Sequence, residues 1–410
     1  MIALLALLAA TVAVGASERE DVPALAAPIE DPSDVALDGF FVALARTEAD
    51  TAGALTRVMH MGDSSIGLDG LPHALRRRMQ DRFGDGGAGF VLVDRESKNY
   101  DNRAATLTAS GWSICYIPYK CDPSGRYGYA GHSFRAREGA RTKLRTRTKG
   151  NYGRSVSRFE LWYETDKRGG VLSMRVDTGA WEKLDTYSDA EPVARWKEFD
   201  VEPGAHAIEL RWGGRGKPRA YGVVMETDGP GVVWDTLSMI GTFTPRLLAY
   251  DTDHIHEQVA HRAPNLLVFG FGGNDLRRFA TDSVTHEVFV AETREVLSRV
   301  RGAKPTACLV VGVIDHVRAG PRQIAKRHLE RMVAAQREAA HAEGCGFFDA
   351  FAAMGGYGSI RKWRKTSPPL SEPDLQHLSM HGRDRMAQMI FDALMVRYDA
   401  YKQRNAAAAR

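Results

Sequence analysis

The most constraining feature of this 410-residue sequence is an alternation of apolar, strand-like runs and amphipathic, helix-like runs that one β-rich block interrupts. Residues 46–95 contain an apolar run, a turn, a helical pattern and a second apolar run, and residues 231–403 resume the same rhythm. Buried strands that alternate with helices are typical of a parallel sheet with both faces covered. We therefore expect one three-layer α/β/α domain, divided in the sequence and continuous in space.

Between these two parts, residues 96–230 lose the helical periodicity. Runs such as Phe159–Tyr163 and Ala207–Trp212 alternate apolar and polar residues, and Gly, Asp and Pro separate the runs. Evenly spaced short strands of period two favour an all-β sandwich, which would be a second domain inserted into the first. Four tryptophans of the block are expected in the core of this sandwich: Trp162, Trp181, Trp196 and Trp212.

The first residues resemble a targeting segment. Residues 1–16 are almost wholly apolar, are too few to span a bilayer, and end in small residues, as a secretory signal peptide does. No Lys or Arg precedes the apolar run, which leaves an uncleaved N-terminal anchor or a misassigned start codon as alternatives. We expect residues 17–45 to form a linker and a first helix, and the protein to be periplasmic or secreted with no further membrane span.

The four cysteines bear on the same question of compartment. Cys115 and Cys121 lie close together in a stretch rich in Gly, Tyr and Pro, and in an exported protein this favours a local disulfide. Cys308 and Cys345 each begin an apolar run, and the sequence leaves open whether they pair or stay as buried thiols. The spacing of Cys and His residues suits no metal site, so we expect neither a metal nor another cofactor.

Three candidate functional residues follow predicted strands at the point where each strand ends. Ser64 follows the first strand, Gly241 the second and Asn274 the third. Ligands of an open α/β sheet bind beyond the carboxyl ends of its strands, so these residues are expected at one edge. A serine between a strand and a helix can present its Oγ at that edge, although Ser is also an ordinary helix cap.

A serine is a weak nucleophile without an adjacent base, and His377 near the end of the chain can be that base. Asp374 is on the same turn as His377 and can hold the imidazole in the required tautomer. The backbone N–H groups of Ser64 and Gly241 and the side-chain amide of Asn274 can stabilise an oxyanion. We therefore predict a catalytic triad of Ser64, His377 and Asp374, with an oxyanion hole of Ser64, Gly241 and Asn274.

Neighbouring polar residues receive other interpretations. Asp63 is expected to hold its turn through hydrogen bonds to backbone N–H groups, and Asp275 to cap or orient its loop. His381 is a rival base, but it lacks an acid three residues before it. Asp315 and His316 follow a fourth strand, where they either line the pocket or form a solvated loop.

The order of these motifs resembles the SGNH (GDSL-type) hydrolase superfamily. Gly62–Ser64, Gly272–Asp275 and Asp374–His377 match three of its four blocks, and Gly241 stands for the fourth without the Asn that often precedes that glycine. The resemblance covers both parts of the α/β domain and implies an SGNH/flavodoxin-like fold with serine esterase activity. The β block after the first motif is similar in position to the carbohydrate-binding-module-like domain of bacterial peptidoglycan O-acetylesterases.

This second resemblance implies an esterase that removes the 6-O-acetyl group of muramic acid from peptidoglycan, or acetyl from another polysaccharide. An O-acetyltransferase with the same triad and a catalytically idle glycan-binding protein are the alternatives. The formal net charge of +4 and the lack of a supporting motif give no reason to expect a nucleic-acid partner. Residues 135–158 are strongly basic, which indicates either attraction to an anionic polymer or a solvated strand face.

Overall fold

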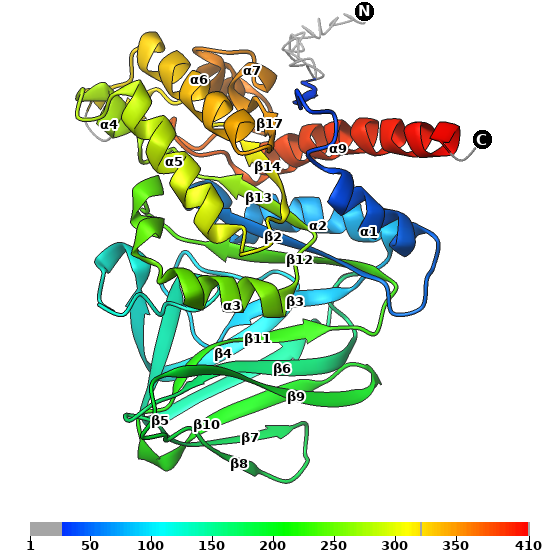
Figure 1. Cartoon of the computed structure of the whole chain (residues 1–410), viewed down its shortest axis with the longest axis vertical. Helices are drawn as coiled ribbons and strands as arrows, with labels where there is room; N and C mark the ends of the chain where they lie inside the picture. The colour runs from blue at the N-terminus through cyan, green and yellow to red at the C-terminus, as the bar shows by residue number, and fades with distance from the viewer. Residues whose placement is uncertain (1–26, 320–321, 409–410) are drawn as a thin grey trace, which may run out of the picture.

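The computed structural model describes residues 27–319 and 322–408 (Figure 1). The predicted signal peptide, residues 1–16, and the first part of the predicted linker lie outside the described residues. The described chain forms a six-stranded mixed sheet with helices around it and a nine-stranded antiparallel sheet beside it. A two-stranded ribbon, β15 (Arg318–Ala319) and β16 (Arg322–Gln323), is separate from both.

The mixed sheet has the strand order β1-β17-β14-β13-β2-β12. Its strands are β1 (Ile29–Glu30), β2 (Leu55–Gly62), β12 (Gly231–Ser238), β13 (Leu266–Gly270), β14 (Ala307–Val311) and β17 (Gly346–Phe348). All of them except β1 run parallel to their neighbours and are largely buried, as strands covered on both faces must be. The carboxyl ends of β2, β12 and β13 therefore lie at one edge of the sheet.

The expectation of an all-parallel sheet is wrong at one edge. β1 pairs antiparallel with β17, and Ile29, in the segment expected to be linker, is buried there. An edge strand leaves N–H and C=O groups unpaired, and a short piece of the incoming chain covers them here. A two-residue strand is too short to display any periodicity, which is why the sequence did not reveal it.

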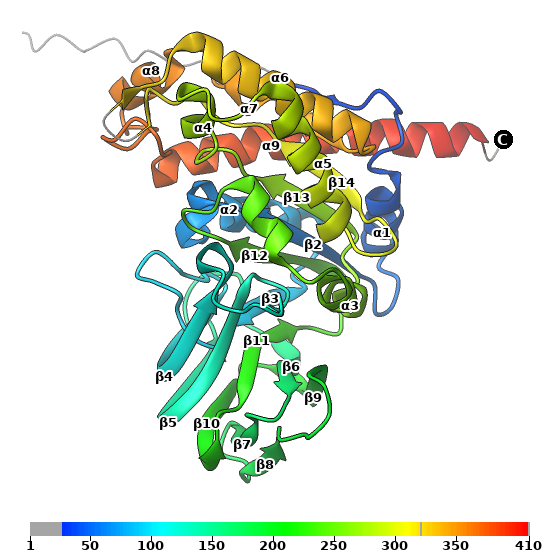
Figure 2. The same cartoon turned by 60° about the vertical axis from the view of Figure 1, so that its left-hand side comes forward.

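Helices cover both faces of the mixed sheet (Figure 2). One layer consists of α1 (Asp38–Glu48), α2 (Gly70–Phe83) and α9 (Met380–Ala408), and the other of α3 (Thr252–Arg262), α5 (His286–Val300) and α6 (Lys326–Ala342). Val58 and Val268 of the strands share an apolar cluster with the first layer, whereas Met59 and Leu267 share one with the second. Consecutive side chains of each strand thus point to opposite layers.

Short helical segments complete this part of the chain. They are η1 (Ser64–Asp69), η2 (Ile117–Tyr119), η3 (Thr244–Ala249), α4 (Leu276–Ala280), α7 (Ala350–Ala353) and α8 (Ser359–Lys365). Across the described ranges, no helix has both the length and the apolar composition needed to cross a membrane.

The antiparallel sheet runs β8-β7-β10-β5-β11-β6-β9, with β3 beside β11 and β4 beside β5. Its strands are β3 (Gly87–Leu92), β4 (Ala105–Tyr116), β5 (His132–Thr146), β6 (Val156–Thr165), β7 (Gly170–Val176), β8 (Glu182–Asp185), β9 (Val193–Gly204), β10 (Ala207–Gly216) and β11 (Arg219–Glu226). β5 bonds to β4, β10 and β11 and so joins all nine strands in one curled sheet, whose inward side chains share one apolar cluster.

β3 also departs from the prediction, which placed residues 46–95 in the α/β domain. Val91 of β3 pairs with Val223 of β11 in the antiparallel sheet. The same strand touches the mixed sheet, since Phe90 N–H donates to Asp235 Oδ1 of β12 at 2.8 Å. A short apolar run is compatible with a strand in either sheet, and its sequence does not predict the strand with which it pairs.

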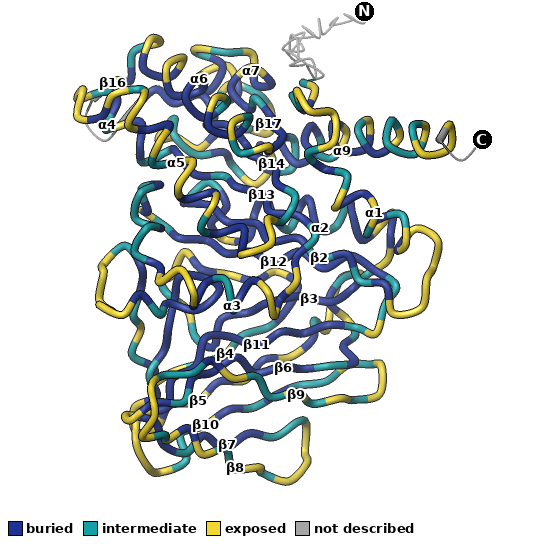
Figure 3. Tube along the Cα trace, viewed as in Figure 1, coloured by how far each residue is buried: buried dark blue, intermediate teal, exposed yellow. Residues whose placement is uncertain are grey.

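A buried ion network joins the two sheets. Glu226, at the end of β11, pairs with Arg57 of β2 at 2.8 Å and with Arg262 of α3 at 2.5 Å. Arg262 also pairs with Asp235 of β12 at 2.7 Å. Figure 3 shows the chain buried along this junction. Buried charges are costly unless they are paired, so the network fixes how the sheets meet.

Two disulfides are present. One joins Cys115 to Cys121, and the other joins Cys308 to Cys345, which are therefore not free thiols. The second disulfide links β14 to the residue before β17, two neighbouring strands of the mixed sheet.

The tryptophans expected in the sandwich core fall into two groups. Trp162 is buried, whereas Trp181, Trp196 and Trp212 are half-buried. The guanidinium of Arg211 lies 3.8 Å from the centroid of the Trp181 ring. Trp196 and Trp212 still pack against the apolar core, although neither ring is fully buried.

Candidate active site

Ser64 occupies the turn between β2 and η1. Because β2 ends at Gly62 and η1 begins at Ser64, the serine lies at the carboxyl edge of the mixed sheet. Asp63 caps η1, accepting from Ser65 N–H at 2.9 Å, and its other oxygen accepts from Gly273 N–H at 3.1 Å. Asp63 is buried, and these contacts agree with the structural role expected of it. It ties the serine turn to the loop after β13.

The loop after β13 approaches the serine turn closely because it is rich in glycine. A Cβ on Gly273 would lie 3.2 Å from Asp63 Oδ2 and 3.4 Å from His316 Nε2. Gly272 has a φ of +127°, a conformation that L side chains rarely adopt. The two glycines therefore allow the loop to bring Asn274 beside Ser64.

His377 lies between Ser64 and Asp374. Its Nε2 is 2.8 Å from Ser64 Oγ, and its Nδ1 is 2.7 Å from Asp374 Oδ2. Because an ionised carboxylate only accepts, Nδ1 carries the proton and Nε2 is free to accept one from the serine. The structure thus brings together three predicted residues, two of which are 313 positions apart. His381 is exposed in the first turn of α9 and makes no hydrogen bond to Ser64.

Asp374 is surrounded by groups that favour its ionised form. Its Oδ1 accepts from the backbone N–H groups of Gln376, at 2.9 Å, and His377, at 3.1 Å. Partial burial raises the pKa of Asp374, but the hydrogen bonds from the His377 side chain and from these N–H groups outweigh it and lower that pKa below its ordinary value. The carboxylate can therefore stabilise a positive charge on the imidazole.

Two of the three expected oxyanion donors line the pocket beside His377, namely Ser64 and Asn274. Asn274 Nδ2 donates to Thr242 O at 3.1 Å, which orients the amide and leaves its second N–H for a ligand. Gly241 is not among the residues that line the pocket. It is exposed in the turn after β12, with a φ of +76°, one residue before Thr242.

Asp315 and His316, which follow β14, have different surroundings in the structure. His316 lines the pocket, and its Nδ1–H donates to Ile314 O at 2.9 Å. Burial lowers the pKa of His316, which keeps the ring neutral. Asp315 points elsewhere and accepts from Ile360 N–H at 2.9 Å. Among the residues that the structure describes, no three His, Cys, Asp or Glu side chains are grouped as metal ligands.

The Gly241 turn is held from the antiparallel sheet, a contact that the sequence analysis missed. Tyr116, at the end of β4, donates from its hydroxyl to Ile240 O at 2.7 Å. The Tyr116 ring is buried and stacks on His132, with ring centroids 4.4 Å apart. A tyrosine in a turn-rich segment carries no sequence signal for a contact with a residue so distant in the chain.

Asp275 holds the other side of the same turn. Its Oδ2 accepts from Thr244 N–H at 2.8 Å and from the Thr244 hydroxyl at 2.9 Å. Burial raises the pKa of Asp275 to about 6, although hydrogen bonds from Thr244 and Arg278 oppose the rise. The Asp275 side chain makes no cap hydrogen bond to α4 and instead ties its loop to the start of η3.

Similar structures have been solved. A peptidoglycan O-acetylesterase is 17% identical to this chain, with a TM-score of 0.74 over 91% of this chain and 99% of that one. A lipase/acylhydrolase from Enterococcus faecalis is 18% identical, with a TM-score of 0.32 over 41% of this chain and 78% of that one. The first similarity establishes a shared fold that includes the antiparallel sheet.

The model of the GDSL-like lipase/acylhydrolase family matches residues 208–382, which include Asn274, Asp374 and His377. Over these residues the chain has the sequence of a GDSL-like serine esterase. In this esterase the matched residues begin inside β10 and end in α9, so Ser64 comes from outside them. A search of curated proteins finds no match for this esterase.

Proposed function

We propose that this esterase removes O-acetyl groups from a cell-envelope glycan, with peptidoglycan as its substrate, through an acyl-enzyme on Ser64. The hydrogen-bond chain from Ser64 through His377 to Asp374 is the observation that carries the proposal. The fold shared with a peptidoglycan O-acetylesterase supports the choice of glycan. The two disulfides support an oxidising compartment outside the cytoplasm.

In the first half of the reaction, Ser64 Oγ attacks the carbonyl carbon of the acetyl ester while His377 Nε2 takes the serine proton. The negative charge on the carbonyl oxygen is stabilised by the Ser64 N–H and by the free N–H of the Asn274 amide. Asp374 stabilises the imidazolium. Collapse of the tetrahedral intermediate breaks the bond to the sugar oxygen, which receives the proton from His377.

In the second half, a water molecule gives a proton to His377 and attacks the acetyl-serine. The second tetrahedral intermediate collapses to acetate, and Ser64 Oγ recovers its proton from His377. An acetyltransferase would use a sugar hydroxyl in place of this water. We assign residues 96–230, which hold most of the antiparallel sheet, to binding of the glycan.

Release of acetate from O-acetylated peptidoglycan and from 4-nitrophenyl acetate tests the proposal. We expect Ser64→Ala to lower both rates by at least about 10⁴-fold, because the covalent step is lost. Ser65→Ala is the matched control. Ser65 is the residue after Ser64, and its Oγ donates to Gly270 O at 3.2 Å and not to His377.

Undiminished turnover by Ser64→Ala would contradict the proposed nucleophile. Hydrolysis of the chromogenic ester without release of acetate from peptidoglycan would contradict the substrate alone. Transfer of the acetyl group to an added acceptor glycan, in place of acetate release, would identify the enzyme as a transferase.

A further inference from the structure

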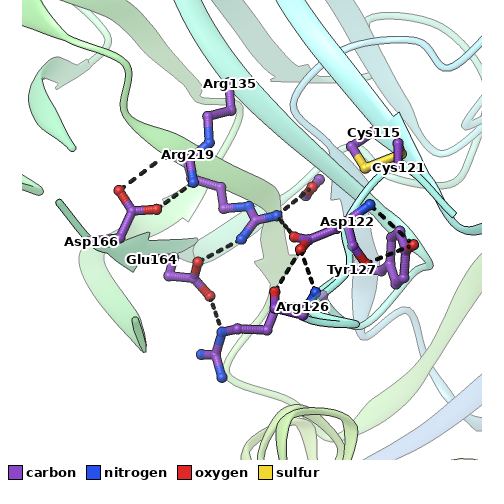
Figure 4. A network of polar contacts seen from close by, with 12 residues as sticks. Cys115, Cys121, Asp122, Arg126, Tyr127, Arg135, Glu164, Asp166 and Arg219 are labelled. Atoms are coloured by element: carbon purple, nitrogen blue, oxygen red, sulfur yellow. Dashed lines mark hydrogen bonds and ion pairs between the residues drawn. A yellow bond between two sulfur atoms is a disulfide. The ribbon is translucent and has the colours of Figure 1, made fainter. Parts of the chain in front are cut away.

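A groove on the antiparallel sheet has no part in the triad. It lies between the end of β4, the start of β5 and the turn after β6, and the Cys115–Cys121 disulfide forms one of its walls. Its volume of about 620 Å³ is in the range of ligand-binding clefts, about 300–1,000 Å³. Figure 4 shows the polar side chains at its base.

The base of the groove is built from ion pairs that neutralise one another. Arg219 is buried and pairs with Asp122 and, at 2.7 Å, with Glu164. Arg135 donates from Nη1 to Asp166 at 3.1 Å. These pairs give the base a fixed shape with little net charge (Figure 4).

The rim of the groove, in contrast, is positive. Arg137, Lys167, Arg168 and Lys217 are exposed, and none of them has a carboxylate partner in the part of the chain that the structure describes. Glu191 is the one lining carboxylate of the described residues without a cationic partner. The rim therefore carries four cations against one anion.

The backbone under these cations is held in place. Lys217 N–H donates to Arg168 O at 2.8 Å, and Arg135 Nη1 donates to Lys217 O at 3.1 Å. The same Arg135 is paired with Asp166, whose Oδ1 accepts from Arg168 N–H at 2.8 Å. The base thus fixes the positions from which Arg168 and Lys217 extend.

We propose that this groove binds a carboxylate of the glycan substrate. Opposite charge steers and holds an anion, and Arg168 and Lys217 can donate to carboxylate oxygens. The disulfide, Ile114 and Pro123 offer apolar surface for the C–H faces of a sugar ring. This inference rests on the proposed function and adds to it the charge of the substrate.

The groove is connected to the Gly241 turn by one short segment of chain. Cys115 lines the groove, and the next residue, Tyr116, bonds to the turn that carries Gly241.

The test uses the full chain with Ser64→Ala, so that no ligand is consumed. Isothermal titration calorimetry compares a peptide-free peptidoglycan tetrasaccharide without O-acetyl groups, whose lactyl carboxylates are free, with N-acetylchitotetraose, which lacks them. We expect tighter binding of the tetrasaccharide, and Arg168→Gln/Lys217→Gln should weaken that binding by about threefold to tenfold. Added salt should weaken it as well. Lys183→Gln/Lys304→Gln, with the same change of charge outside the groove, should bind as the parent does.

Equal affinity for the two oligosaccharides, or an unchanged affinity in Arg168→Gln/Lys217→Gln, would overturn the proposal. Equal displacement of the tetrasaccharide by a short DNA duplex would overturn it too, because the groove would then select charge alone. Hydrolysis of 4-nitrophenyl acetate by otherwise wild-type protein with Arg168→Gln/Lys217→Gln should match the wild-type rate. Loss of groove binding and loss of Ser64 chemistry are thus measured separately.

Discussion

Asp63 and Asp374 are both carboxylates beside the proposed nucleophile, and their hydrogen-bond partners separate their roles. Asp63 accepts from two backbone N–H groups and is buried, so it shapes the turn. Asp374 accepts from the His377 ring, so it acts on the base. Adjacency in sequence favours Asp63 as the partner of Ser64, and geometry favours Asp374.

We expect Asp374→Asn to lower kcat for 4-nitrophenyl acetate by roughly 10²–10⁴-fold, because an amide no longer holds His377 in the required tautomer or stabilises its charge. Steady-state kinetics across pH measure the effect. Asp384→Asn, at a partly exposed aspartate that pairs with Arg78, is the control and should keep the wild-type kcat. A kcat in Asp374→Asn within threefold of the control, on the order of 1 kcal/mol or less, would assign the acid elsewhere.

The triad could be predicted from the sequence because its parts are short local patterns, a serine after a strand and an acid three residues before a histidine. The position of Gly241 relative to the pocket was harder to predict. Its turn is shaped by Tyr116 and Thr242, and the contact with Tyr116 comes from a residue more than a hundred positions away. Local pattern carries no information about such a contact.

At the scale of elements, the helices and parallel strands were predictable because their apolar periodicity is strong. β1 and β3 were not assigned correctly, since a very short strand has no periodicity and an apolar run does not specify its partner. In the antiparallel sheet, a period of two predicts which face of each strand is buried. The period does not predict which strands are hydrogen-bonded neighbours, so it could not show that β5 bonds to three other strands.

The end of β4 and the turn after β12 form a contact between elements that we expect to affect catalysis. Tyr116→Phe removes the hydroxyl that bonds to Ile240 O and should lower kcat about fivefold to tenfold, with little change in KM for a small ester. Tyr116 is a positioning residue here, and the split between kcat and KM distinguishes this role from a loss of folded protein. Tyr152→Phe, which removes a hydroxyl that bonds to Asp81 on the surface, should leave both constants unchanged. Equal kinetics in the two variants would contradict the coupling.

At the scale of the whole molecule, the two sheets depend on Glu226. Burial raises the pKa of Glu226, but Arg262 and Arg57 outweigh burial and hold that pKa well below its ordinary value. The carboxylate is therefore more easily ionised in the folded state than in the unfolded state. Its contribution to stability is complete above the unfolded pKa, about 4.3, and is lost as pH falls toward the folded pKa.

We expect Glu226→Gln to lower the free energy of unfolding at pH 7 by about 3–5 kcal/mol, because it removes the buried carboxylate that pairs with Arg57, Arg158 and Arg262 and leaves Arg262 only Asp235. Urea denaturation measures the change. The difference from wild type should shrink as pH is lowered from 5 to 3. Glu198→Gln removes an exposed carboxylate 3.6 Å from Arg158 and should cost less than about 1 kcal/mol. A difference that grows at low pH would contradict the assigned sign.

The division of the mixed sheet between two distant parts of the sequence has a consequence for biosynthesis. A ribosome makes the turn with Ser64 first and then the antiparallel sheet, and it adds His377 only 313 residues after Ser64. A nascent or prematurely terminated chain therefore holds the serine without its base. The proposed hydrolytic centre can form only after Asp374 and His377 have been added to the chain.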